Sequence, residues 1–296
     1  MTEPASMTSN KHLVRGYLAA VATLLMWSGF SLFSRLAGKS VLTPYDVYAL
    51  RLITASLFLL PFAKRLPRGA WKDGRLWLLT CLCSLIYCPL AYNGFKYAPA
   101  AHGGILLAGL QPLLIGLIVW ATTGTRPGRL RLGGLALITG GVACAAVPHF
   151  ISWSPEIAFG DLLILLSSIL WAFYATLAAR WRYPPWGLTC AIAFGSSIVY
   201  LPIYFLWLPK QLLAAPLPLI ISQGLFQGLI ATIIAMLTYL KTISLLGAER
   251  AAALLSLTPI VIGLAAIPML DEALTSWLMG GLLLVSLGAY LASQRA

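Results

Sequence analysis

Residues 111–117 read QPLLIGL, and residues 258–264 read TPIVIGL, 147 positions further along the chain. The same offset relates residues 133–138 (GGLALI) to residues 280–285 (GGLLLV). Matches of glycine and leucine alone are common in apolar segments, but one offset shared by separate segments is not explained by composition. The sequence therefore predicts an internal repeat that covers most of the chain.

The chain around these stretches is apolar throughout. Hydrophobic residues make up 60% of the 296 positions, charged residues only 9%, and the mean hydropathy is +0.88. A soluble domain carries about 25% charged residues, because its surface must face water. This composition excludes an ordinary soluble globule and predicts a protein whose surface faces membrane lipid.

Apolar runs of about 20 residues, long enough to cross a hydrocarbon core of about 30 Å, are separated by short polar links. None of the links is long enough to hold a soluble domain. We therefore predict an all-α integral membrane protein with ten transmembrane helices, at residues 14–37, 44–63, 75–95, 101–122, 129–147, 158–180, 187–208, 213–242, 247–269 and 274–293.

The Lys and Arg residues predict the orientation of these helices. The net charge is +12, but the basic residues fall in short loops rather than in one patch, which argues against a nucleic-acid partner. With the N-terminus in the cytoplasm, 15 basic residues lie inside and only Arg35, Lys39, Lys96 and Lys210 lie outside. The positive-inside rule thus predicts a multi-pass protein with both termini cytoplasmic. We expect its membrane to be a bacterial inner membrane.

The repeat and the helix count together predict two inverted halves. We divide the chain into a cytoplasmic tail (1–12), whose first ten residues are polar and expected to be disordered, a first five-helix repeat (13–147) and a second (155–296). Five is an odd number, so the second repeat must cross the bilayer in the opposite sense. Secondary transporters use this architecture and bind substrate near the midplane, between the repeats. The pattern therefore favours a transporter.

The motifs resemble those of the drug/metabolite transporter superfamily, and specifically of its EamA-type ten-helix exporters. The resemblance covers the chain after residue 12, and the aromatic content with the paired Trp27 and Trp171 looks most like the aromatic amino-acid exporter branch. It implies two EamA-like repeats and a central substrate cavity. The stretches that carry it are residues 92–100 (YNGFKYAPA), 111–112 (QP), 239–243 (YLKTI), 247–252 (GAERAA) and 258–259 (TP).

One departure from the family pattern concerns coupling. The family often carries a Glu before the fourth-helix proline and a Gly-Glu pair after that helix, whereas this chain has Gln111 and the stretch 122–126 (TTGTR). Every Asp and Glu lies in a tail, in a loop or within a turn or so of a helix end, and His102 is expected at the membrane interface. The sequence therefore predicts facilitative transport without obligatory proton exchange.

Polar and aromatic residues of the predicted helices supply the candidate substrate site. Gln223 and Gln227 are four residues apart and so share one helix face. Pro112 and Pro259 occupy equivalent places in the repeats and are predicted to act as hinges. No catalytic residue, metal site or cofactor is expected. The predicted substrate-binding residues are Trp27, Tyr87, Tyr92, Asn93, Gln111, Trp171, Gln223, Gln227, Tyr239 and Thr258.

Arg51 is the one basic residue inside a predicted span, and two interpretations remain open for it. It either extends to the surface and pairs with Asp46, or anchors a substrate carboxylate.

The function predicted from these features is export of amino acids with aromatic or bulky apolar side chains, and of related small metabolites, by alternating access. Membrane lipid and the small-molecule substrate are the expected partners. A transporter of sugar phosphates or nucleotide sugars is the nearest alternative, but it needs inward-facing Lys or Arg. A membrane-embedded enzyme is disfavoured, because His12, His102 and His149 are far apart in the sequence.

Overall fold

The computed structural model describes residues 5–124, 128–151 and 154–294, and within these ranges the regular elements are all helical. Ten helical stretches in the described residues are long and apolar enough to cross a membrane, as predicted. In the first repeat they are built from α1 (Ala5–Gly38), α2 (Pro44–Leu59) with η1 (Leu60–Arg65), α3 (Gly74–Thr80) with η3 (Cys81–Leu85) and α4 (Tyr87–Tyr97), α5 (Ala100–Gly103) with η4 (Gly104–Gly109) and α6 (Gln111–Thr123), and α7 (Arg129–Ile151).

The second repeat follows the same order of spans. Short 3₁₀ turns, η2 (Ala70–Lys72) and η5 (Leu212–Ala214), lie in the loops before the third and eighth spans. The five spans are built from α8 (Pro155–Trp181), α9 (Pro185–Trp207), α10 (Leu217–Gln223) with η6 (Gly224–Ile234) and α11 (Ala235–Leu246), α12 (Ala248–Leu255) with α13 (Thr258–Leu270), and α14 (Ser276–Ser293).

The largest differences from the predicted helix ends lie in the first and eighth spans. α1 begins at Ala5, although we expected residues 5–10 to be disordered and the first span to begin at residue 14. Once the apolar part of a helix has formed, each added residue contributes one hydrogen bond without a new nucleation step. The eighth span begins at Leu217 rather than at residue 213, because η5 and Pro216 intervene.

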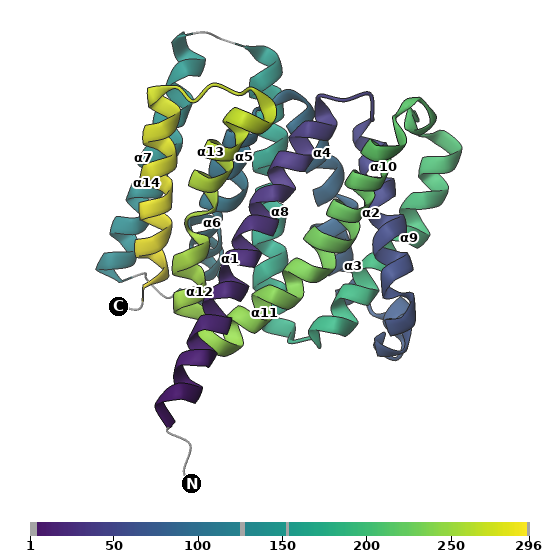
Figure 1. The fold of residues 1–296 in the computed structure, drawn as a ribbon, viewed down its shortest axis with the longest axis horizontal. Coiled ribbons are helices and arrows are strands. Elements are labelled where there is room, and N and C mark those ends of the chain that lie inside the picture. The colour runs from purple at the N-terminus through teal and green to yellow at the C-terminus, as the bar shows by residue number, and fades with distance from the viewer. Residues whose placement is uncertain (1–4, 125–127, 152–153, 295–296) are drawn as a thin grey trace.

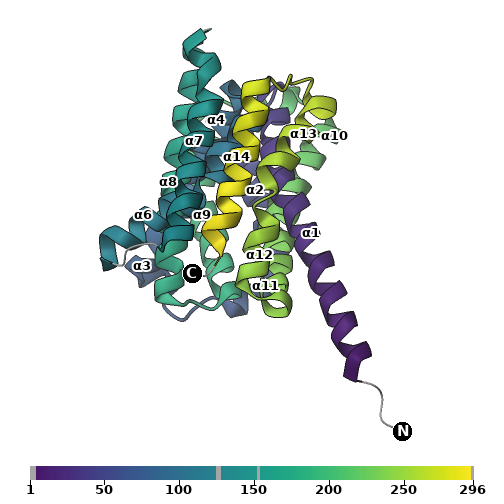
Figure 2. The ribbon, with the colours of Figure 1, turned by 90° about the vertical axis from the view of Figure 1, so that its left-hand side faces the viewer.

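The contacts between spans follow the symmetry of the repeat. α1 packs against η6 and α11, and α4 packs against α8, so the first span of each repeat contacts the third span of the other (Figure 1). The second spans of the two repeats pack against each other. The two fourth spans also pack against each other, and so do the two fifth spans. The fifth pair, α7 and α14, lies side by side in both ribbon views (Figures 1 and 2). A pseudo-twofold axis in the membrane plane accounts for all of these pairings.

Glycines set the contact between α7 and α14. A Cβ atom on Gly134 would lie 2.7 Å from the carbonyl oxygen of Gly288, and one on Gly281 would lie 2.8 Å from that of Gly141. These four positions are two pairs related by the 147-residue offset, 134 with 281 and 141 with 288. Small residues allow membrane helices to approach closely, so the repeat is built into the backbone packing itself.

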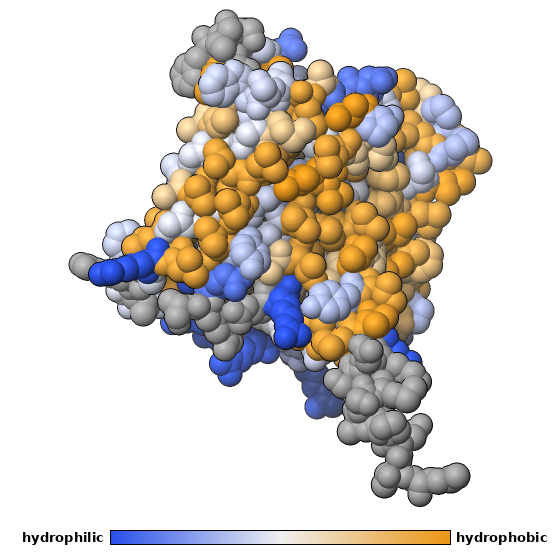
Figure 3. Space-filling view, turned by 60° about the vertical axis from the view of Figure 1, so that its left-hand side comes forward, coloured by the Kyte–Doolittle hydropathy of each residue, from blue (hydrophilic) through white to orange (hydrophobic). Residues whose placement is uncertain are grey.

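The sides of the bundle are apolar. Large side chains such as Leu18, Leu57 and Leu206 are 64–68% exposed, as only a lipid-facing surface tolerates in such number. Figure 3 shows orange, apolar residues across the middle of one side of the molecule and the strongest blue toward the end where the N-terminus lies. We call this end, with loops 66–73 and 182–184, the terminal end. The other end, with loops 39–43, 98–99 and 271–275, is the opposite end.

Four spans are irregular, and they correspond in the two repeats. The third and eighth spans contain the π-helical segments η3 and η6. The fourth span is interrupted at Leu110 and the ninth at residues 256–257. Pro112 and Pro259 then stand in the first turns of α6 and α13. Each proline lacks the N–H that would continue the preceding helix, which explains why both repeats break at this point.

Candidate functional site

The interior of the bundle holds a polar network on four spans, which we call the Arg51 network: Arg51, Tyr92, Gln227 and Ser34. Arg51 Nη1 donates to the Tyr92 hydroxyl at 3.2 Å, and that hydroxyl donates to Gln227 Oε1 at 3.2 Å. Gln227 Nε2 then donates to Ser34 Oγ at 3.2 Å. Tyr92, Gln227 and Ser34 are 0–2% exposed and Arg51 is half-buried, so the network joins α2, α4, η6 and α1 within the bundle.

Arg51 does not pair with Asp46, contrary to the first of our two interpretations. Asp46 Oδ2 accepts from the backbone and hydroxyl of Thr43, both at 2.8 Å, and from the Gln211 backbone at 3.1 Å. Asp46 Oδ1 accepts from the Tyr204 hydroxyl at 2.5 Å. This carboxylate therefore caps α2 and fastens it to the seventh span, and Arg51 points elsewhere.

Aromatic rings surround the guanidinium group of Arg51. Its Cζ lies 5.6 Å from the centre of the Phe30 ring, a cation–π distance. The Phe30 ring in turn lies 5.9 Å from that of Tyr92 and 6.5 Å from that of Tyr87. Tyr48 lies 6.3 Å from Tyr92, and all four aromatic residues belong to one buried cluster.

Two tryptophan–tyrosine pairs cross between the repeats. Trp27 of the first span lies 4.9 Å from Tyr239 of the eighth, with the rings inclined by 43°. Trp171 of the sixth span lies 5.3 Å from Tyr87 of the third, inclined by 44°. In both pairs, a tryptophan on the first span of one repeat contacts a tyrosine on the third span of the other repeat. The match is approximate, because the 147-residue offset pairs Tyr239 with Tyr92 rather than with Tyr87.

The glutamines outside the Arg51 network also bind across spans. Gln111 Nε2 donates to the Ser168 hydroxyl at 2.9 Å and to its carbonyl oxygen at 3.1 Å. Gln223 Nε2 donates to the Phe33 carbonyl at 3.0 Å. The Oε1 atoms of both glutamines are buried without a hydrogen-bond partner. Buried polar atoms are almost always paired, so these two amide oxygens are candidate acceptors for a donor group of a substrate.

Two predicted site residues bind only within their own span. The Asn93 side chain donates to the Pro89 carbonyl, and the Thr258 hydroxyl donates to that of Leu255. The structure therefore brings Tyr87, Tyr92, Trp171 and Gln227 together, places Trp27 with Tyr239, and keeps Asn93 and Thr258 out of the network. The sequence analysis missed Phe30 and Ser34, although both follow Trp27 at helical spacing, three and seven residues on.

The opposite end carries a second group of charges around a cavity of about 240 Å³. His102 Nδ1 lies 2.9 Å from Asp161 Oδ1, and Arg35 Nε lies 2.8 Å from Glu272 Oε1. His102, which we expected at the membrane interface, lies two positions from the start of its span, and α8 brings a carboxylate to it. The cavity is lined by Arg35, Pro99, Ala101, His102, Ala145, Ser154, Ile157, Ala266, Glu272, Ala273, Leu274, Thr275 and Leu278.

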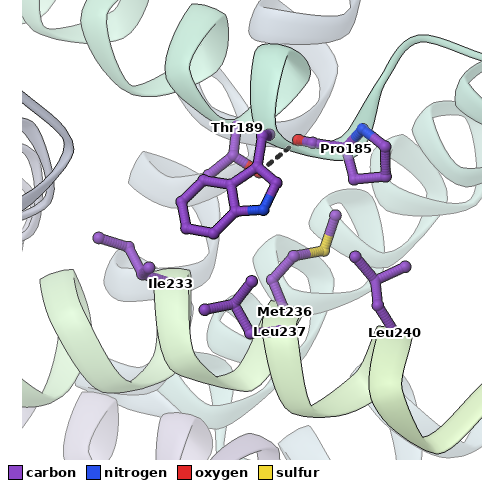
Figure 4. Close-up of a pocket in the computed structure, with 7 residues that line it drawn as sticks. Pro185, Thr189, Ile233, Met236, Leu237 and Leu240 are labelled. Atoms are coloured by element: carbon purple, nitrogen blue, oxygen red, sulfur yellow. Dashed lines mark hydrogen bonds between the residues drawn. The ribbon is translucent and has the colours of Figure 1, made fainter. Parts of the chain in front are cut away.

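A small apolar cleft lies between α9 and the eighth span (Figure 4). Trp186 lines this cleft together with Ile233, Met236 and Leu237, and the Thr189 hydroxyl donates to the Pro185 carbonyl at 2.9 Å. Its volume of about 10 Å³ is close to that of one water molecule, so it is a packing defect rather than a substrate site. Among the described residues, no three His, Cys, Asp or Glu side chains are grouped to hold a metal ion.

The fold and the interior network together define a helical membrane transporter of two inverted repeats. The chain belongs to the EamA-like transporter family, whose profile matches it twice, over residues 14–147 and 158–294. The family and the relatives indicate a transporter rather than an enzyme.

Three known proteins show the extent of the similarity. The chain is 26% identical to "Uncharacterized transporter YwfM" of Bacillus subtilis over 289 residues, 93% of each chain. It is 25% identical to an "Uncharacterized transporter" of Archaeoglobus fulgidus over 202 residues, 66% of each chain. A solved crystal structure is similar with a TM-score of 0.62 and 18% identity, over 94% of this chain and 96% of that one, a likeness that shows the fold.

Proposed function

We propose that this transporter exports amino acids with aromatic or bulky apolar side chains, and related small metabolites, across a bacterial inner membrane. The observation that carries the proposal is the pair of crossed tryptophan–tyrosine contacts between the repeats. Rocking of one repeat against the other must separate or slide these rings, and an aromatic or bulky apolar side chain of the substrate fits between such surfaces.

The proposed orientation follows the charges of the loops. The terminal end faces the cytoplasm, because most Lys and Arg residues lie in its loops and the positive-inside rule places these in the cytoplasm. The opposite end, with the ion pair of Arg35 and Glu272, then faces the outside. An ion pair that joins the two repeats at this end favours loading of substrate from the cytoplasm, as an exporter requires.

The proposed mechanism is facilitative. The described acidic residues nearest to a span centre are Asp46, which is engaged in capping α2, and Asp161, which lies six positions into its span. Neither belongs to the Arg51 network. Gln111, in the place where the family often has a glutamate, binds Ser168 and does not titrate.

The alternative of a phosphorylated sugar as substrate has less support. Arg51 is the one described Lys or Arg more than five positions from either end of a candidate span. Lys96 and Lys241, the other basic residues considered for this role, have exposed side chains. A phosphate dianion is usually bound by several cations or by helix N-termini, whereas a single arginine matches a monoanion.

Reconstitution tests the proposal directly. Purified transporter in liposomes is given a panel of radiolabelled amino acids, with and without a pH gradient. We expect saturable uptake of phenylalanine, tryptophan, tyrosine and leucine, little uptake of glutamate or lysine, and no dependence on the pH gradient. Uptake of glucose 6-phosphate with no uptake of any amino acid would contradict the proposed substrate, and a strict requirement for the gradient would contradict the facilitative mechanism.

A further inference from the structure

We infer that Arg51 binds the carboxylate of the substrate and that the amino group is dispensable, so that aromatic monocarboxylates without an amine are ligands of the same site. This inference rests on the proposed function and names the part of the substrate that is recognised. It starts from the charge of Arg51 and from what surrounds it.

The positive charge of Arg51 is not neutralised by the protein. Among the described residues no Asp or Glu lies within 4 Å of its guanidinium nitrogens, and its one hydrogen bond uses a single N–H, to Tyr92. A guanidinium group carries five N–H donors in a planar fork that matches a carboxylate. An ionisable side chain inside a span is by default a candidate functional group, and Arg51 has no carboxylate partner among the described residues.

The hydroxyl protons of the Arg51 network are already committed, so the donors left for a ligand are the guanidinium and the second Nε2 proton of Gln227. The Tyr92 hydroxyl donates to Gln227, Gln227 Nε2 donates to Ser34, and Ser34 Oγ donates to the Phe30 carbonyl at 2.6 Å. This series of hydrogen bonds ends on a backbone carbonyl oxygen. It holds Tyr92 with its oxygen lone pair toward Arg51, and so fixes the guanidinium without neutralising it.

The rings around Arg51 place an aromatic side chain next to the bound carboxylate. Phe30 lies under the guanidinium, and the Tyr87 ring lies 6.5 Å from Phe30 and 5.3 Å from Trp171. These rings lead from Arg51 toward the boundary between the repeats. A ligand with its carboxylate on Arg51 therefore extends its ring toward Tyr87 and Trp171, where aromatic pairing is favourable.

No described carboxylate is placed to pair with an ammonium group in this region. On the eighth span, which carries Gln227, one buried acceptor lacks a hydrogen-bond partner. It is Gln223 Oε1, a neutral amide oxygen one turn from Gln227. An ammonium group can donate a hydrogen bond to this oxygen, but a neutral amide does not neutralise the charge of the ammonium. A monoanion on Arg51 leaves the site neutral, whereas a zwitterion leaves one positive charge, and this asymmetry makes the carboxylate the required group.

Three ligands that share a phenyl ring test the inference on the full-length wild-type transporter in lipid nanodiscs. They are 3-phenylpropionate (carboxylate only), phenethylamine (ammonium only) and L-phenylalanine, with Kd measured by titration. We expect 3-phenylpropionate to bind at least as tightly as L-phenylalanine, and phenethylamine to bind at least about tenfold more weakly, the loss expected when hydrogen bonds to a charged group are removed. Equal binding of phenethylamine and 3-phenylpropionate, or no binding of 3-phenylpropionate, overturns the inference.

Variants of Arg51 test whether this residue binds the carboxylate. Arg51→Gln should weaken the binding of 3-phenylpropionate by at least about tenfold. Arg51→Lys should weaken it less, because lysine keeps the positive charge but lacks the planar guanidinium group. Lys241→Gln, which removes an exposed charge at the terminal end, is the matched control and should leave the Kd unchanged. If Arg51→Gln does not fold, the comparison of the three ligands on the wild type decides alone.

The outcomes also separate this inference from the proposed function. Transport of phenylalanine that survives in Arg51→Gln, together with no binding of 3-phenylpropionate, would overturn the inference and leave the proposed function standing. Binding of 3-phenylpropionate without transport of any amino acid would leave the inference standing and remove the proposed function.

Discussion

Arg35 Nε lies 2.8 Å from Glu272 Oε1, and this ion pair joins the first span of one repeat to the last loop of the other. Arg35 Nη1 also donates to the carbonyls of Phe95 and Lys96, and Glu272 Oε2 accepts from the Ala100 backbone at 2.8 Å. The pair thus fastens α1, α4, α5 and the loop before α14 at one point of the opposite end. It lines the cavity there, and we expect it to hold this end of the bundle closed.

The substitution Glu272→Gln should loosen this closure. Removing one charge of a largely buried pair shifts the equilibrium toward an open opposite end by about 1 kcal/mol or more, about a fivefold change in population. The measurement is the alkylation rate of a cysteine placed at Ala266, which lines the cavity but is only 1% exposed, in a background without the five native cysteines. Glu156→Gln, an exposed acid at the same end, is the control. Equal rates in the two variants would show that the ion pair does not hold the closed state.

The glycines between α7 and α14 give a prediction with an adjacent control. In Gly141→Ala the new Cβ would lie 2.6 Å from a Val285 methyl group and 2.8 Å from the Gly281 carbonyl oxygen, so the backbones must separate. Gly140 has nothing within 4 Å of its Cβ position. We expect Gly141→Ala to lower stability by about 1–3 kcal/mol and Gly140→Ala to leave it unchanged or slightly raised. Thermal denaturation of the two purified variants checks this, and equal Tm values would contradict the close packing.

The ten spans and the repeat were predictable because each depends on local or periodic sequence. A run of apolar residues must be long enough to cross the bilayer, and a single offset recurs in Gly134 and Gly281 as it does in Pro112 and Pro259. The helix at residues 5–12 was missed, because a polar segment carries no such signal and is helical here by continuation of α1.

The partners of Arg51 could be predicted only in part. Five residues separate Asp46 from Arg51, which at about 100° per residue places them about 140° apart around the helix, so geometry alone disfavours the pair. Contacts to Tyr92 and Phe30, by contrast, depend on how α4 and α1 pack against α2. The π-helical segments η3 and η6 change the facing of every later residue in their spans, and their wider turns have no sequence signature that we could use.

A hydrogen bond between two loops at the terminal end makes stability depend on pH. The Tyr183 hydroxyl donates to Asp73 Oδ2 at 2.6 Å, and this bond holds the pKa of the Asp73 carboxyl below its ordinary value. Burial, with the bond to Asp73 as the next cause, raises the pKa of Tyr183. A lowered carboxyl pKa stabilises the fold above the unfolded value of about 4, and the contribution is lost as the pH falls through the folded pKa.

Tyr183→Phe should therefore lower Tm slightly at pH 7 and less at pH 3. The effect is small, because solvent screens this pair at the loop surface. The measurement is the difference in Tm between wild type and Tyr183→Phe from pH 3 to pH 8. Tyr290→Phe, at an exposed tyrosine, is the control and should give a difference that does not vary with pH. A Tyr183→Phe difference that grows toward pH 3 would mean that the sign of the linkage is wrong.

We expect Pro112 and Pro259, which are equivalent in the two repeats, to affect the rate of transport. Alanine at positions 112 and 259 restores an N–H and allows the helices on either side of Leu110 and of residues 256–257 to join, which stiffens both fourth-helix breaks at once. We expect the double variant to lower the maximal transport rate severalfold with little change in KM. Pro202→Ala, at a proline inside α9, is the control. An unchanged rate in the double variant would assign Pro112 and Pro259 to fixed kinks rather than to hinges.

Trp171 provides the most direct test of the aromatic boundary. Its ring contacts Tyr87 at 5.3 Å and Tyr174 at 5.2 Å, and its loss removes aromatic pairing worth about 0.5–1.5 kcal/mol per contact. Trp171→Ala should lower kcat/KM for the transported amino acid by about five- to tenfold without loss of expression, while Trp171→Phe retains most of it. Trp207→Ala, at a tryptophan 73% exposed at the end of α9, should have no effect on transport. If flux is unchanged in Trp171→Ala, the ring only packs the helices, and the crossed pairs do not contact the substrate.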